Sequence, residues 1–243
     1  MILEICTSNI QSAINGEKAG AHRIELCSEL AVGGITPSYG LIKQVLELVN
    51  IPVFVLIRPR SGNFTYSVDE FEMMKNDIQL SKDLGCAGIV SGALNSDNTV
   101  DVEKTKELIE VSKPLEFTFH RAFDWTPNPY EALEQLIQLN VNRILTSGQE
   151  SFAEKGIFVL QQLKKLANGR ITILPASGIN RDNVLIFKGG GFDEIHCSAS
   201  LPSAVNPSPK VAMNSSKFFD ETIQYNSDVE LIQSILNIIN DKA

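Results

Sequence analysis

The chain has 243 residues, of which 43% are hydrophobic and 21% charged, with a formal net charge of −8. This composition is that of an ordinary packed domain, and the scatter of its lysines and arginines argues against a nucleic-acid-binding surface. No apolar run approaches the ~18 residues that a membrane span needs, and Met1 is followed by a strand-like run rather than by an apolar leader. We therefore expect a soluble, cytoplasmic protein whose four widely spaced cysteines are thiols.

Eight short apolar runs alternate with longer segments of helical period. The runs cover residues 2–6, 23–27, 53–58, 87–91, 115–120, 142–146, 171–175 and 193–197. Between them, spacings of three and four such as Leu133, Leu136 and Ile137 are typical of helices with one buried face. Strand–helix repetition indicates a parallel sheet, and eight such units in ~250 residues indicate a closed (β/α)8 barrel, the TIM barrel. The competing fold is a doubly wound open sheet, but no G-x-G-x-x-G follows the first run.

The C-terminal part differs in composition from the rest. The segment from about 200 to 226 is polar and contains Pro202, Pro207 and Pro209. Because prolines interrupt regular structure, we expect an irregular excursion there, followed by a final helix over about 228–240. We interpret residues 1–243 as a single TIM-barrel domain that carries this excursion.

Polar residues gather at the predicted C-terminal ends of the strands, where TIM barrels carry their functional groups. These residues are Cys6, Glu25, Cys27, Arg58, Arg60, His120, Arg121, Asp124, Ser147, Ser177, Gly178, His196 and Ser198. His120 is the candidate general acid or base, with Glu25 or Asp124 as its partner. For each group taken alone, a structural hydrogen bond or ion pair is the alternative.

Three charged residues are predicted to lie inside the barrel. Glu4 and the pair Arg23 and Glu25 occupy strand positions that alternate by two, which sends them to one face. A buried charge without a partner costs several kcal/mol in order of magnitude, so we expect these residues to interact. Cys86 and His22 fall at the opposite ends of their strands, where a packing role is expected.

Several motifs follow one another along residues 1–200. They are Glu4-Ile-Cys6, Arg23-Ile-Glu25-Leu-Cys27, Gly33-Gly-Ile-Thr-Pro-Ser38, Ile57-Arg-Pro-Arg60, Thr118-Phe-His-Arg-Ala-Phe-Asp124 and Leu145-Thr-Ser-Gly-Gln149. Together they resemble the CutC family. The resemblance implies a cytoplasmic barrel linked to copper homeostasis, with Cu(I) bound by the residues that are here Cys6 and Cys27. Asn63 departs from the acidic residue expected there in many relatives, which argues against a carboxylate role at that position.

The first function that fits these residues is copper binding. Cys6 and Cys27 end neighbouring strands, whose axes lie ~4.8 Å apart, so two thiolates at one mouth can share a soft Cu(I) ion. Cys197, which follows His196 on the strand expected beside the first one, is a candidate third donor, although alternation sends the side chains of Cys197 and His196 to opposite sides. The alternative is that these cysteines are packed as small hydrophobic residues.

The second function is that of a TIM-barrel enzyme for a small anionic metabolite, phosphorylated metabolites included. Arg58, Arg60 and Arg121 are candidate anion-binding groups. The loops that carry Ser147, Ser177, Gly178, His196 and Ser198 follow the last three strands, and backbone N–H groups of such loops often bind phosphate. A tight strand-to-helix turn is the alternative role of the Ser-Gly pair. The expected partner is thus a metal ion or a small anion, not a nucleic acid or a membrane, and a homo-oligomer is left open.

Overall fold

The computed structural model describes residues 1–205, 210–211, 213, 220 and 222–241. The strands within these residues are β1 (Ile2–Thr7), β2 (Arg23–Leu26), β3 (Val53–Leu56), β4 (Gly88–Ser91), β5 (Glu116–Phe119), β6 (Arg143–Thr146), β7 (Thr172–Pro175), β8 (Glu194–Cys197), β9 (Ser200–Ala204) and β10 (Ile223–Ser227). The α-helices are α1 (Ile10–Ala19), α2 (Tyr39–Leu48), α3 (Val68–Asp83), α4 (Val102–Ser112), α5 (Pro129–Gln138), α6 (Ile157–Ala167), α7 (Val184–Gly189) and α8 (Val229–Asn240). Two short 3-10 helices, η1 (Leu30–Val32) and η2 (Arg121–Trp125), follow β2 and β5.

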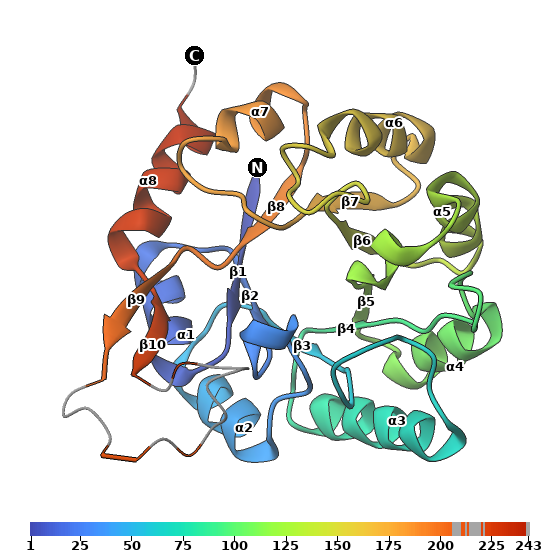
Figure 1. The fold of residues 1–243 in the computed structure, drawn as a ribbon, viewed down its shortest axis with the longest axis horizontal. Helices are drawn as coiled ribbons and strands as arrows, with labels where there is room; N and C mark the ends of the chain where they lie inside the picture. Colours follow the sequence, from blue (N-terminus) through green and yellow to red (C-terminus); the bar gives the residue numbers. More distant parts are fainter. Residues whose placement is uncertain (206–209, 212, 214–219, 221, 242–243) are drawn as a thin grey trace.

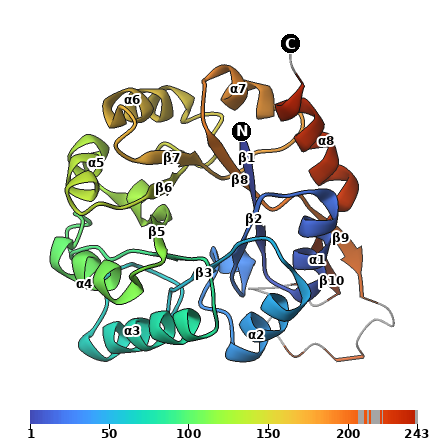
Figure 2. The same cartoon turned by 180° about the vertical axis from the view of Figure 1, so that it is seen from behind.

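The first eight strands form one parallel sheet in the order β7-β6-β5-β4-β3-β2-β1-β8. The sheet curls into a nearly closed barrel, and the α-helices surround it (Figure 1; Figure 2 from behind). Each run predicted as a strand is a strand, so the predicted TIM barrel is confirmed. The strand order follows the chain without a switch point, which rules out the doubly wound alternative.

The ladder of backbone hydrogen bonds is open between β7 and β8, which are the two edges of the sheet. In β7 the N–H of Ala176, directly after the strand, donates to Thr146 O of β6 at 2.9 Å. Because successive backbone groups point to opposite sides of a strand, the nitrogen of Pro175 faces β8 instead. Proline has no N–H, so residue 175 cannot donate to β8. β-Sheets tolerate proline on an edge strand, which is where Pro175 lies.

Alternation along the strands separates two buried layers. Leu3, Ile5 and Ile24 face the helices and belong to the main apolar core, where each is fully buried. Glu4 and Glu25, one residue along in each strand, point to the barrel interior and are also buried. The side of these strands that faces the barrel interior therefore carries charged residues, and the side that faces the helices carries aliphatic ones. The alternation by two along the sequence predicted this separation.

The C-terminal segment is more regular than the prolines indicated. β9 and β10 form an antiparallel pair in which Pro202 lies opposite Tyr225. Val205 N bonds Thr222 O, so the odd-numbered residues of β9 face its partner and the nitrogen of Pro202 points away from it. The prediction of an irregular segment over 200–226 is thus wrong for both of its ends; most of the part between lies outside the described residues.

The final helix is confirmed as α8, from Val229 to Asn240. Ile232, Ile235 and Ile239 are buried, and the helix packs beside α1 and α7 on the outside of the barrel (Figure 1). Asp228 caps its N-terminus by accepting a hydrogen bond from Leu231 N at 2.9 Å. No helix among the described residues is both long and apolar enough to cross a membrane.

Candidate functional site

A cavity of about 410 Å³ opens at the C-terminal ends of the barrel strands. Its polar lining consists of Cys6, Glu25, Arg58, His120, Arg121, Ser177, His196, Cys197 and Ser198. Its apolar lining includes Leu30 and Val32 of η1, Phe64 and Trp125. Most of the residues that the sequence placed at the strand ends therefore meet around one space, but Cys27, Arg60, Asp124 and Ser147 do not line it.

Cys6 and Cys27 lie side by side at one edge of this cavity. Their Sγ atoms are 3.9 Å apart, close enough for one ion to contact both sulfurs. Cys6 pairs with Glu25 across β1 and β2, so Cys27, two residues further, projects to the same side of the sheet. The hydrogen bond with Cys27, together with burial, raises the pKa of the Cys6 thiol well above its ordinary value. Burial also raises the pKa of Cys197, to about 12.

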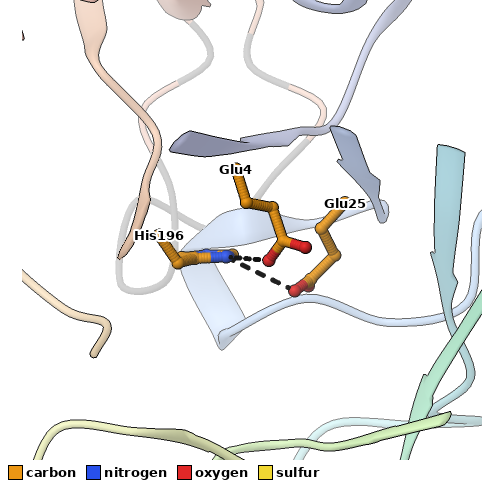
Figure 3. A group of neighbouring side chains, drawn as sticks. All are labelled: Glu4, Glu25 and His196. Atoms are coloured by element: carbon orange, nitrogen blue, oxygen red, sulfur yellow. Dashed lines mark hydrogen bonds and ion pairs between the residues drawn. The ribbon is translucent and has the colours of Figure 1, made fainter. Parts of the chain in front are cut away.

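Glu4, Glu25 and His196 converge at the floor of the cavity from β1, β2 and β8 (Figure 3). His196 Nδ1 lies 2.7 Å from Glu4 Oε1 and 3.6 Å from Glu25 Oε2. Burial would lower the pKa of His196, but the charge of Glu25 and hydrogen bonds to Cys6 and Glu4 raise it well above 6.5. Burial raises the pKa of Glu25 to about 7. For Glu4, burial is outweighed by His196 and Arg23, and its pKa falls to about 2.

A charged layer lies beneath this floor, formed by the first residues of β2, β6 and β8. Arg23 binds Glu4 and Glu194, and Glu194 also lies 3.3 Å from Arg143. The corresponding first residue of β4 is a glycine, and a Cβ there would come within 2.6 Å of the Phe54 ring. This ring contacts both guanidiniums, with its centroid 4.8 Å from Arg23 Cζ and 5.1 Å from Arg143 Cζ. The prediction that Glu4, Arg23 and Glu25 are buried is confirmed, although Glu25 contacts His196 rather than Arg23.

His120 lies across the cavity, at the end of β5. Its Nδ1 accepts a hydrogen bond from Ala122 N at 3.4 Å, which places the proton of the neutral ring on Nε2. Burial, assisted by the charge of Arg58, lowers the pKa of His120 to about 3, so the ring is neutral at physiological pH. Nε2 is buried and has no hydrogen-bond partner among the described residues. His120 therefore presents an unused N–H donor in the wall of the cavity.

Arg58 is largely committed to the protein. Its Nη1 donates to Val32 O and Gly34 O and its Nη2 to Gly62 O, each at 2.9 Å. The guanidinium also lies 4.9 Å from the centroid of the Phe64 ring. Arg58 thus joins the loops after β2 and β3 and contributes positive charge to the cavity, while its buried Nε has no hydrogen-bond partner among the described residues.

Arg121, in contrast, is only partly engaged. Its Nε donates to Asp124 Oδ2 at 2.8 Å and its Nη2 to Ser147 Oγ at 3.0 Å, while 42% of its side chain is exposed. Asp124 also accepts hydrogen bonds from Ser147 N and Gln149 N. Asp124 and Ser147 therefore hold the loop after β6 and orient Arg121 at the edge of the cavity.

The remaining predicted residues divide between the cavity and the outer surface. Arg60 is paired with Glu70 at the start of α3, away from the cavity lining. Ser177 lines the cavity, but its Oγ donates to Ser151 O at 2.9 Å. Gly178 has φ +71°, and a Cβ there would lie 2.6 Å from the Phe152 ring, so this turn requires glycine. Ser198 contacts Ser200 at 3.1 Å.

Comparison with known proteins places this barrel in one family. The model of the CutC family matches residues 1–201. The chain belongs to the CutC family. It is 44% identical to a CutC family protein of Proteus mirabilis over 241 residues, which covers 98% of this chain and 96% of the relative. It is 43% identical to a copper homeostasis protein cutC homolog of Mus musculus, covering 99% and 90%.

A crystal structure of a CutC described as a putative copper homeostasis protein, from Streptococcus agalactiae, has the same fold. Its TM-score is 0.77 at 35% sequence identity, and the match covers 82% of this chain and 98% of that one. The predicted resemblance to CutC is thereby confirmed. The family match ends at residue 201, so β10 and α8 lie beyond it.

The convergence of Glu4, Glu25 and His196 is the feature that sequence reasoning missed. Each residue was identified singly, as an interior charge or as a mouth residue. Glu4 pairs with Arg23 across β2 and with His196 across β8. The eighth strand was predicted to lie beside the first, but strand order does not give the register that sets His196 opposite Glu4.

Proposed function

We propose that this CutC family member binds Cu(I) through Cys6 and Cys27 and acts in cytoplasmic copper homeostasis. The observation that carries the proposal is the 3.9 Å separation of the two sulfurs. It is shorter than two metal–thiolate bonds of ~2.3 Å each, so one ion can contact both sulfurs. A pair of thiolates is the donor set that a soft monovalent copper ion prefers. The name of the mouse relative, a copper homeostasis protein, agrees with this assignment.

The surroundings of the two thiols also suit a transient metal cargo. Cys6 borders the open cavity, which offers a route in and out, whereas Cys27 is fully buried behind it. Cys197 borders the same cavity but pairs with Ile5 and belongs to the outer apolar core, so its side chain is on the opposite side of the sheet from Cys6 and is not expected to be a third donor. All four cysteines are free thiols, the state that a reducing cytoplasm maintains.

Anaerobic titration with Cu(I) in competition with a chromophoric chelator tests the proposal. We expect one Cu(I) per chain, lost in Cys6→Ser and in Cys27→Ser. Cys86→Ser is the matched control, because Cys86 is an equally buried thiol just before β4, at the opposite end of the barrel. Unchanged affinity in the Cys6→Ser/Cys27→Ser double variant would contradict the proposal.

A second function is favoured by the opposite wall of the cavity. We propose as the alternative an enzyme that acts on a small anionic metabolite, phosphorylated metabolites included. The unpaired Nε2–H of His120 carries this alternative, since a buried donor without a partner calls for a ligand atom or a water. Arg58 and Arg121 supply positive charge around the same space, and about 410 Å³ is within the usual range for small-molecule sites.

Thermal stability in the presence of phosphate, sulfate and sugar phosphates tests this alternative. An anion at 100 times its dissociation constant adds ~2.7 kcal/mol to the free energy of unfolding. We expect the stabilisation to be lost in Arg121→Gln and kept in Arg170→Gln, a surface arginine paired with Glu134. No stabilisation by any of these anions would remove the support for the anionic ligand.

A further inference from the structure

The floor of the cavity holds three metal-ligating side chains that neither proposed function uses as ligands. Glu4, Glu25 and His196 each offer one donor atom, and these atoms all lie within 4.8 Å of one another. They come from three neighbouring strands, β8, β1 and β2, which are hydrogen-bonded to one another at the β8 end of the sheet. A rigid sheet therefore holds them at this spacing without help from a loop (Figure 3).

One donor of this group is unused. Glu25 is 4% exposed, and its Oε2 has no hydrogen-bond partner within the described part of the chain. The nearest cationic nitrogen, His196 Nδ1, lies at 3.6 Å, beyond hydrogen-bonding distance. A buried carboxylate oxygen without a partner is rare, and it calls for a ligand that is absent from the protein itself. Glu25 and His196 both line the cavity, so such a ligand has access to them.

The other carboxylate is oriented as a metal ligand would be. Arg23 holds Glu4 Oε2 and is itself held by Glu194, which leaves Glu4 Oε1 directed at His196 Nδ1 at 2.7 Å. Ligating carboxylates in metalloproteins are fixed by outer hydrogen bonds in this way. Glu194 also offsets the charge of Arg23. The negative charges of Glu4 and Glu25 therefore remain available to balance a cation.

We propose that Glu4, Glu25 and His196 form a binding site for a divalent first-row transition cation, for which Zn²⁺ is the probe. Two carboxylate oxygens and one imidazole nitrogen suit Zn²⁺, Fe²⁺ or Mn²⁺ better than they suit Cu(I). The cation takes the place of the proton between His196 Nδ1 and Glu4 Oε1. It also binds Glu25 Oε2, the carboxylate oxygen that has no hydrogen-bond partner among the described residues. Three protein ligands leave a further position open toward the cavity, as in catalytic rather than structural zinc sites.

This site uses different donor atoms from the copper site, although its His196 is hydrogen-bonded to Cys6. Copper is assigned to the Cys6 and Cys27 sulfurs, whereas the divalent cation is assigned to oxygen and nitrogen donors. The open position of the cation faces the space that Arg121 and His120 border, so an oxygen of a small anion could complete its coordination. The two metals are thus separable by mutation.

Titration with Zn²⁺ in the Cys6→Ser/Cys27→Ser background tests the site without thiolate competition. We expect one Zn²⁺ per chain in this background. Adding Glu25→Gln, which keeps the shape of the side chain, should weaken binding at least about 100-fold, because loss of an outer-shell partner alone costs 10–100-fold. Glu134→Gln, on the surface of α5, is the matched control and should leave affinity unchanged. No Zn²⁺ bound in the double variant, or equal affinity after Glu25→Gln, would overturn the proposal.

Co²⁺ spectroscopy gives a readout that does not depend on a Glu25 variant remaining folded. In the wild-type chain, Co²⁺ at the proposed site should show d–d bands without the intense sulfur-to-metal charge transfer of a two-thiolate site. A spectrum dominated by that charge transfer, and abolished in Cys27→Ser, would assign the divalent ion to the cysteines and refute the site. Cu(I) titration of Glu25→Gln tests the copper proposal separately, because this variant keeps both cysteines.

Discussion

Arg23 lies inside the barrel between two carboxylates, those of Glu4 and Glu194. Replacing it with Met removes the cation that the two buried carboxylates share, so Glu4 keeps only His196 and Glu194 only Arg143. We expect Arg23→Met to lower the free energy of unfolding by about 3–5 kcal/mol, measured by urea denaturation. Arg170→Met removes an exposed ion pair with Glu134 and should have little effect. A loss for Arg23→Met no larger than for Arg170→Met would show that the interior network is not required.

His120 makes stability depend on pH. The folded chain keeps its pKa near about 3, whereas an unfolded chain protonates histidine near pH ~6.5. Unfolding therefore takes up a proton between these values, and stability falls as the pH falls through this window. In His120→Gln this contribution is absent, so the stability lost between pH about 7.5 and about 5 should be ~2 kcal/mol smaller than in the wild type. Parallel pH dependence of the two proteins in urea denaturation would contradict a neutral, buried His120.

For single residues, the sequence predicts where a side chain lies better than it predicts its hydrogen-bond and ion-pair partners. Alternation by two was enough to put Glu4, Arg23 and Glu25 in the interior. It could not show that Asp124 accepts hydrogen bonds from the loop after β6 or that Arg60 is paired with Glu70. Such hydrogen bonds depend on loop conformation, and no periodicity encodes them.

The strands and helices of the barrel were predictable because each strand is a short apolar run and each helix has one apolar face. The pair β9–β10 was not, since Pro202 reads as a breaker unless its outward-facing nitrogen is known. This hairpin is tied to α1: Asn15 Nδ2 donates to Ser227 O at 2.8 Å, and Ser227 N donates to Ser12 Oγ at 3.0 Å. The segment that follows the barrel is thereby anchored on its first helix.

Helix α8 contributes to the outer core from beyond the family match. Ile232 is fully buried, so Ile232→Ala should cost about 2–5 kcal/mol in the free energy of unfolding, by loss of apolar burial and formation of a cavity. Ile238, which is half-buried on the same helix, is the control, and its replacement by Ala should cost less. Equal small losses at both positions in thermal denaturation would mean that α8 is not an integral part of the fold.

At the scale of the whole molecule, the barrel rule explains why residues from seven strands or their following loops meet around one cavity. That convergence was predictable from strand order alone. The floor of the cavity was not, because it depends on the closing contact between β8 and β1 and on which carboxylate oxygen finds a partner. These buried contacts determine whether the cavity binds a metal ion or an anionic substrate.

The proline at the end of β7 has a consequence for how the barrel moves. With no donor at Pro175 to join β7 to β8, the cheapest local opening of the wall separates these two strands. Amide hydrogen–deuterium exchange should detect it: the N–H of Ile173, which faces β8 like the nitrogen of Pro175, should exchange faster than that of Ala176, which is bonded to β6. His196 and Ser177 flank this seam on the cavity side. Opening of this seam would therefore widen the cavity between Ser177 and His196 and give an ion a second route to its floor.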